Sequence, residues 1–143
     1  MVQIWQYKEF TISTDRQRLD LELIHNFLSC SYWASGRELA VVKKSIDNSF
    51  CFGVYWGTQQ VGFALVITDY ATYAYLSDVF IVKSFRGQGL GKWLVGTIVS
   101  HPELQGLRKW SLGTADAHGL YRQFGFAEAK YPERYMEKLA ENV

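Results

Sequence analysis

The sequence predicts a single domain of the α+β (mixed α/β) class, in which helices flank a central, mostly antiparallel sheet. Runs rich in β-branched and aromatic residues recur along the chain, and apolar residues follow helical spacing between several of them. No repeat, linker or low-complexity tract divides the 143 residues. A chain of this length typically forms one domain, here 1–143, and its core needs neither metals nor disulfides for stability.

The first part of the chain predicts a strand, two helices and a hairpin. A helix is expected where apolar side chains recur at helical spacing after Ser13, Thr14 and Asp15, which offer capping oxygens. The hairpin is expected because a short, glycine-containing segment joins two β-rich runs. The expected elements are a strand over 2–12, a helix over 15–28, a loop over 29–36, a helix over 37–46, and strands over 50–56 and 61–68.

The second part alternates strands and helices, which predicts one parallel strand pair. A strand that reaches its neighbour through a helix runs parallel to it, by a right-handed crossover. Pro102 ends one helical pattern and Gly125 ends the next. The expected elements are a strand over 72–82, a helix over 89–101, a strand over 109–112, a helix over 115–124 and a possible last strand over 135–139.

Composition excludes several classes of function. The net charge is +1 and no basic stripe occurs, so we expect no nucleic-acid partner. No apolar run approaches the roughly 20 residues of a membrane span, so we expect no membrane partner. Cys30 and Cys51 lack metal-ligand spacing, which predicts buried thiols, no metal and a reduced cytoplasmic location. The aromatic content of 16% indicates either an aromatic-lined pocket or an aromatic-rich core.

A glycine-rich segment between the strand over 72–82 and the next helix predicts an anion site. The first amides of a helix lack partners, and the helix dipole is positive there. Glycines let that backbone approach phosphate oxygens, and flanking cations add charge-assisted contacts. The segment is Arg86-Gly87-Gln88-Gly89-Leu90-Gly91-Lys92.

The spacing of these glycines excludes two common nucleotide motifs. A Walker A loop would need a glycine at Arg86 and a hydroxyl at Trp93. A dinucleotide fingerprint would need its third glycine at Lys92 or at Leu94. A nucleotide-binding module is therefore disfavoured, while a tight turn with packing glycines stays open as the structural alternative.

The pattern that remains, Arg-x-x-Gly-x-Gly at Arg86, Gly89 and Gly91, resembles the GNAT superfamily of N-acetyltransferases. Residues 120–126 also match the Leu-Tyr-x-x-x-Gly-Phe pattern of that family, about thirty residues after the loop. The resemblance covers about 76–126 and is closest to small bacterial members. It implies a GNAT-like acyl-CoA N-acyltransferase fold. Ser84 and Thr114 depart from the family pattern, which has proline and asparagine there.

The resemblance implies acetyl-CoA as co-substrate and no metal. In this family the glycine loop holds the diphosphate, and the preceding strand pairs with the pantetheine arm through its backbone. One amide of that strand, here Ile81, would polarise the thioester carbonyl. The implied coenzyme-binding residues are Phe80, Ile81, Val82, Arg86, Gly87, Gln88, Gly89, Leu90, Gly91, Lys92 and Thr114.

The resemblance also implies direct attack of a primary amine on the thioester, without an enzyme nucleophile. Tyr121 takes the family's position for the general acid, and a phenol keeps its proton at neutral pH. Asp78 and His118 are candidate bases, beside a water chain without a dedicated base. By alternation, Asp78 shares a face with Leu76, Phe80 and Val82, where apolar surroundings would raise its pKa. An Asp78 tied to backbone donors is the structural alternative.

The acceptor side is expected at Tyr32 and Trp33, between the first two helices. Aromatic walls there suit an apolar or cationic amine of a small molecule or peptide. A catalytically weak GNAT-fold protein that binds acyl-CoA as a signal is the alternative function. The oligomeric state stays open, although homodimers are common in the family.

Overall fold

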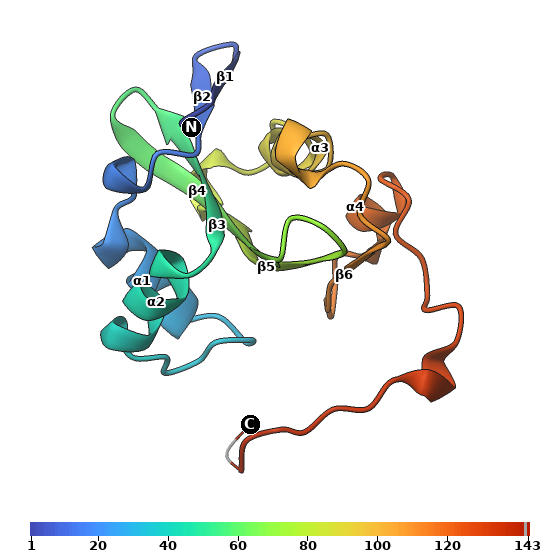
Figure 1. Cartoon of the computed structure of the whole chain (residues 1–143). Coiled ribbons are helices and arrows are strands. Elements are labelled where there is room, and N and C mark those ends of the chain that lie inside the picture. Colours follow the sequence, from blue (N-terminus) through green and yellow to red (C-terminus); the bar gives the residue numbers. More distant parts are fainter. Residues whose placement is uncertain (142) are drawn as a thin grey trace.

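The computed structural model describes residues 1–141 and 143 and shows a six-stranded sheet between two layers of helices (Figure 1). Helices α1 (Leu21–Ser29) and α2 (Leu39–Asp47) cover one face of the sheet. Helices α3 (Leu90–Val99) and α4 (His118–Arg122) lie on the other face. The mixed α/β class is therefore confirmed. None of the helices in the described residues has the length and apolar character to span a membrane.

The strands follow one another across the sheet in chain order. Every neighbouring pair is antiparallel except the last, β5 with β6, which is parallel. The single parallel pair confirms the expectation for the second part of the chain. The strands are β1 (Ile4–Tyr7), β2 (Phe10–Ser13), β3 (Phe50–Trp56), β4 (Gln59–Thr68), β5 (Tyr73–Ile81) and β6 (Lys109–Ser111).

The N-terminal region differs from the expectation in two places. The expected strand over 2–12 is a hairpin of β1 and β2, which turns at Lys8 with a φ of 55°. The expected helix over 15–28 is divided into a 3₁₀ turn, η1 (Arg16–Arg18), and α1. Two aspartates explain the division, because Asp15 caps η1 and Asp20 accepts at 3.0 Å from Leu23 N to start α1.

The C-terminal region also differs. Helix α4 is shorter than the expected helix over 115–124, because Thr114 Oγ1 accepts from Ala117 N at 3.0 Å and holds the preceding residues in a turn. The expected strand over 135–139 does not form; residues 127–141 are exposed and lead away from the sheet (Figure 1). A strand needs a partner to satisfy its amides, and no strand of the described chain pairs with this segment.

Alternation along β3 and β4 creates a core on each face of the sheet. Neighbouring residues such as Cys51 and Phe52, or Phe63 and Ala64, pack on opposite sides. The core under α1 and α2 consists of Ile24, Leu28, Ala34, Val42, Ile46, Cys51, Phe63, Leu65 and Phe80. Residues of α3 that enter the other core are Leu90, Leu94, Val95 and Ile98.

A β-bulge interrupts β5. Asp78 and Val79 together stand opposite Ala64 of β4, and Asp78 has a left-handed backbone conformation with a φ of 55°. A bulge adds one residue to one strand and so reverses the faces of the side chains beyond it. The pairs on either side of the bulge are Phe63 with Phe80 and Leu65 with Ser77.

The bulge shows that the expected common face of Asp78 and Leu76 was wrong, whereas Asp78 and Phe80 both lie on the side of α1. Simple alternation gives Asp78 one common face with Leu76, Phe80 and Val82. Leu76 instead packs in the core on the α3 side, whereas Phe80 packs in the core on the α1 side. The extra residue in β5 is the physical reason, because it shifts the alternation by one position between Leu76 and Phe80.

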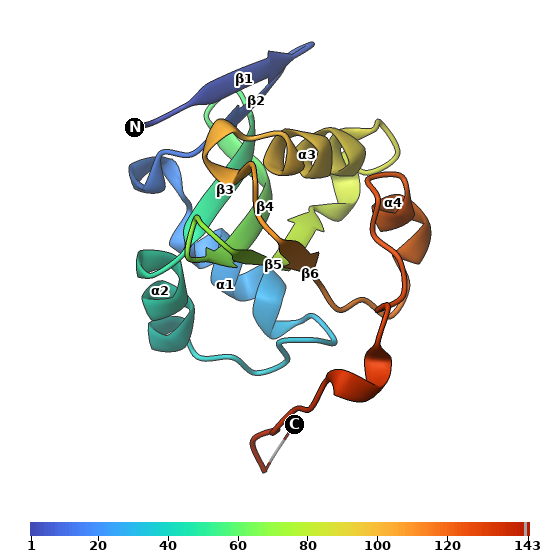
Figure 2. The same ribbon diagram turned by 45° about the vertical axis from the view of Figure 1, so that its right-hand side comes forward.

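The sheet opens between its last two strands. Strand β6 pairs with β5 only from Tyr73 to Tyr75, and Figure 2 shows the chain turning from β6 toward α4. From Leu76 to Ile81, β5 therefore has β4 on one side and, among the residues that the structure describes, no strand on the other. This part of β5 is a free strand edge inside the fold, and the candidate site lies beside it.

Candidate functional site

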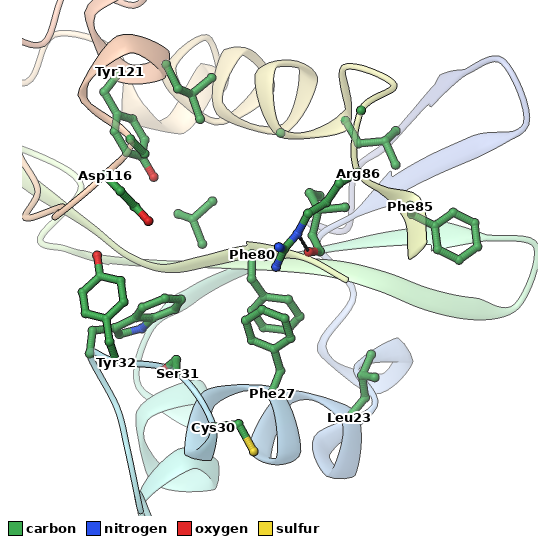
Figure 3. Close-up of a pocket in the computed structure, with 18 of the residues that line it drawn as sticks. Leu23, Phe27, Cys30, Ser31, Tyr32, Phe80, Phe85, Arg86, Asp116 and Tyr121 are labelled. Atoms are coloured by element: carbon green, nitrogen blue, oxygen red, sulfur yellow. Dashed lines mark hydrogen bonds between the residues drawn. The ribbon is translucent and has the colours of Figure 1, made fainter. Parts of the chain in front are cut away.

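A cavity of about 930 Å³ lies beside the free edge of β5 (Figure 3). Its wall comes from α1 and the loop after it, the end of β5, the glycine loop with the start of α3, and α4. Six aromatic side chains line it, so the aromatic residues form a pocket wall as well as a core. They are Phe27, Tyr32, Trp33, Phe80, Phe85 and Tyr121.

Ile81 presents its main chain to the open edge. Val82 N donates to Val61 O of β4 at 2.8 Å. Because residues of an antiparallel strand alternate in direction, the peptide groups of Ile81 point away from β4. Arg86 Nε donates to Ile81 O at 2.8 Å from that side. The Ile81 amide is thus the donor that faces the opening.

The neighbours of Ile81 do not offer their main chain. Val82 O accepts from Phe85 N at 3.0 Å, so both peptide groups of Val82 are engaged and its expected backbone contact with pantetheine is corrected. Phe80 pairs with Phe63 of β4. Phe80 enters the site through its ring, which stacks on Phe27 with centroids 3.9 Å apart.

The glycine loop leaves donors uncovered at the start of α3. Gly89 is the N-cap with a φ of 83°, and the first helical bond runs from Trp93 N to Gly89 O at 3.0 Å. The amides of the first turn before Trp93 therefore have no helical partner. Gly91 lines the cavity, and a Cβ there would meet nothing within 4 Å. These amides are therefore available to an anion, and the anion site stays a prediction.

Not every residue expected at the coenzyme lines this cavity. Gln88 instead closes the loop, because its Nε2 donates to Phe85 O at 3.2 Å. Lys92 is an exposed residue of α3, and Thr114 caps the turn before α4. Of the expected set, the cavity is lined by Phe80, Ile81, Arg86, Gly87, Gly89, Leu90 and Gly91.

Tyr121 directs its hydroxyl into the cavity from α4 (Figure 3). The residue is 9% exposed. Burial, with smaller contributions from Tyr32 and Asp116, raises the pKa of Tyr121 to about 12. The phenol therefore holds its proton throughout the neutral range, as a general acid must.

Asp78 lies behind the wall of the cavity. It is 7% exposed; Oδ1 accepts from Trp33 Nε1 at 2.9 Å, and Oδ2 accepts from Arg37 Nη1 at 3.0 Å. Both oxygens are engaged, which supports the structural alternative, with side chains as donors instead of backbone groups. His118 is exposed and lines a second cavity, between β6, α4 and the C-terminal segment.

Sequence reasoning missed several residues of the site. Cys30, which was expected to be buried, is exposed and lines the cavity. Cys51 is buried as expected, and burial raises the pKa of its thiol to about 12. Asp116 lines the cavity beside Tyr121, and Arg37 holds Asp78. Asp116 had a signal, since it precedes the helix that bears the acid. Among residues 1–141 and 143, no three His, Cys, Asp or Glu side chains are grouped to hold a metal.

Arg37→Ala is expected to lower the free energy of unfolding by about 2–3 kcal/mol. Removing one partner of a fully buried ion pair costs about 3–5 kcal/mol, because the other charge is left uncompensated. The Asp78 side chain is 4% exposed and that of Arg37 is 26% exposed, so the loss falls at or just below the lower end of that range. Urea unfolding measures the change.

Lys43→Ala is the matched control for Arg37→Ala. Lys43 pairs with Asp47 at 2.9 Å, with both side chains more than half exposed, so its loss should cost less than about 0.5 kcal/mol. Equal unfolding curves for the two variants would contradict the structural role assigned to the Arg37–Asp78 pair.

The chain is similar to known proteins in both sequence and structure. The chain matches the family model for the "Acetyltransferase (GNAT) family" over residues 16–126. A GNAT-family protein from Xanthomonas campestris pv. campestris has a TM-score of 0.90 and 48% identity, over 92% of this chain and 93% of that chain. These matches confirm the resemblance and the fold that it implies.

Two further proteins are similar to the chain. A protein of Gibberella zeae, named for acetyltransferase function, is 30% identical over 65% of this chain and 64% of its own length. The chain thus matches less than two thirds of that relative. A GNAT-family acetyltransferase from Elizabethkingia anophelis, solved with acetyl-CoA bound, shares the fold with a TM-score of 0.66 and 14% identity, over 95% of this chain and 91% of that chain.

Proposed function

Because this chain belongs to the GNAT family of acetyltransferases, we propose that it transfers the acetyl group of acetyl-CoA to a primary amine of a small molecule or peptide. One arrangement carries the proposal. The free edge of β5, the uncovered amides of α3 and the Tyr121 hydroxyl all border one cavity. These are the groups needed to hold an extended arm, a diphosphate and a leaving thiolate.

Two parts of the chain would hold the coenzyme. The first-turn amides of α3, with Arg86 beside them, suit the diphosphate through hydrogen bonds and the helix dipole. The open edge at Ile81 suits the amide-bearing pantetheine arm, as an added strand. When bound, acetyl-CoA supplies a thioester whose carbonyl carbon a neutral amine can attack directly.

The transfer also requires a proton for the departing sulfur and an acceptor for the proton of the amine. The N–C bond forms, the C–S bond breaks, and the electron pair leaves on sulfur. Tyr121 donates its phenol proton to the sulfur and regains one from solvent, while the nitrogen of the attacking neutral amine releases one proton to water and keeps the other in the amide. The Ile81 amide, which faces the opening, would donate to the carbonyl oxygen as that oxygen gains charge, and one such donor contributes about 3 kcal/mol. Because both Asp78 oxygens are engaged, we assign proton removal to water.

Two measurements on the full chain test the proposal. Calorimetry should show saturable binding of acetyl-CoA, and chromatography should show CoA released together with N-acetylated product from a panel of primary amines. Chromatography is preferred to a thiol reagent because Cys30 is exposed. Absence of binding would overturn the proposal. Binding without turnover on any amine would favour the alternative of a regulatory acyl-CoA-binding protein.

A Cys30→Ser variant serves as the control for direct attack. Cys30 is the exposed thiol at the cavity, so it is the residue that an acyl-enzyme route would require. Unchanged turnover of this variant is expected when the amine attacks the thioester itself.

A further inference from the structure

The two ends of the cavity differ in charge. Arg86 is the one cation and Asp116 the one carboxylate among the described residues that line it. Figure 3 shows Asp116 with Tyr121 and Tyr32 on the side of the cavity away from Arg86. The diphosphate belongs at the Arg86 end, next to the glycine loop. The Asp116 end is therefore left for the acceptor.

The Asp116 carboxylate is available to a ligand. Its main-chain N donates to Thr114 Oγ1 at 3.4 Å, but within the described part of the chain no donor or cation contacts its side-chain oxygens. Asp78 contrasts with it, since its two oxygens are taken by Trp33 and Arg37. Asp116 is exposed at the cavity, so a cationic ligand can reach its carboxylate and form a charge-assisted hydrogen bond with it.

The aromatic residues beside Asp116 are held in place. Tyr32 Oη accepts from Ala115 N at 3.0 Å, which ties the loop after α1 to the segment that bears Asp116. Trp33 is fixed by its hydrogen bond to Asp78 and packs edge-on against Tyr32, with centroids 5.1 Å apart. Aromatic faces attract ammonium groups, so these two rings add to the preference of the carboxylate for a cation.

Asp116 also lies close to the general acid. Asp116 and Tyr121 both line the cavity, and Figure 3 shows them on the same side of it. A group that binds at Asp116 is therefore near the atoms that react, and it need not be a remote part of the acceptor.

We propose that Asp116 binds the reacting nitrogen of the acceptor as an ammonium ion, against Tyr32 and Trp33, and that the acceptor is an alkyl amine charged at neutral pH. This inference rests on the proposed function and narrows its acceptor class. The bound ammonium releases one proton to water before the neutral nitrogen attacks. A weakly basic aryl amine, which is neutral at pH 7, gains nothing from Asp116.

Benzylamine and aniline form a matched pair of acceptors for the test. Both are primary amines with one ring, but only benzylamine is an ammonium ion at neutral pH. Asp116→Asn is expected to raise KM for benzylamine about 10- to 100-fold, the effect of losing a charge-assisted hydrogen bond. KM for aniline and the Kd of acetyl-CoA should stay unchanged.

Two further variants control for charge and shape. Asp47→Asn removes an equal charge from the exposed face of α2, away from the cavity, and should behave as the wild type. Asp116→Glu keeps the carboxylate and should recover most of the benzylamine affinity. Calorimetry of benzylamine on CoA-saturated protein should show the same order of affinities without any turnover.

The outcomes separate this inference from the proposed function. If acetyl-CoA fails to bind the wild type, the proposed function itself is overturned. If acetyl-CoA binds but benzylamine does not, or if Asp116→Asn leaves benzylamine affinity unchanged, only the role of Asp116 is overturned. An equal change for aniline and benzylamine would likewise contradict recognition of an ammonium ion.

Discussion

Tyr121→Phe is expected to lower kcat about 100-fold or more, while the affinity for acetyl-CoA changes by less than about twofold. A positioned general acid contributes about 10²- to 10⁴-fold to the rate. Loss of one hydroxyl leaves the ring packed against Phe126 and keeps the cavity shape. Steady-state rates and calorimetry on the same sample give the two values.

The pH dependence follows from the raised pKa of Tyr121. The acid form is the active form, and it is lost only as the pH rises through a pKa of about 12. Tyr121 should therefore cause no fall in kcat below about pH 11. Tyr131→Phe, which removes a hydroxyl from the exposed C-terminal segment, is the control. A Tyr121→Phe protein with full kcat at every pH would remove the acid role.

Gly91→Leu is expected to weaken acetyl-CoA binding on the order of 100-fold without harming the fold. Gly91 lines the cavity and a Cβ there meets no protein atom, so a larger side chain projects to where the diphosphate must approach. More than one charge-assisted hydrogen bond between the start of α3 and the diphosphate is then lost. Leucine is the better helix former by about 0.8 kcal/mol, so the free energy of unfolding should hold or rise.

Gly119→Leu is the matched control for Gly91→Leu. Gly119 lies in α4, a Cβ there also meets no protein atom, and the residue does not line the cavity. This variant should bind acetyl-CoA like the wild type. Equal affinity of the two leucine variants would show that the diphosphate does not approach the start of α3.

The parts of the fold that the sequence predicts are those that local patterns determine. The strands from β3 to β6 and the helix after the glycine loop follow from alternation, helical spacing and turn residues. The bulge at Asp78 escapes such reasoning, because one extra residue in a strand leaves no mark on composition. The sequence did not predict that the helix expected over 15–28 is divided into η1 and α1. Asp15 and Asp20 are both good caps, and the sequence alone does not show that both are used.

The candidate site divides in the same way. The glycine loop and Tyr121 lie in contiguous motifs, so their chemistry can be recognised in the sequence. The places of Arg37 and Asp116 depend on contacts between distant segments. Arg37 contacts Asp78, and Ala115, the residue before Asp116, contacts Tyr32 of the loop after α1. No spacing rule relates such residues. Only the packed chain shows which carboxylate is neutralised and which is free.

The unpaired stretch of β5 has a consequence for the protein when no coenzyme is bound. A bare strand edge is a template for any extended peptide, including one from a neighbouring molecule, and proteins usually shield such edges. The pantetheine arm of a bound coenzyme would occupy this edge, so the coenzyme would also protect the protein against self-association. At a hundred times its Kd, a ligand also adds about 2.7 kcal/mol to the stability of the native state. If the proposed function holds, self-association through this edge should decrease as the concentration of coenzyme rises.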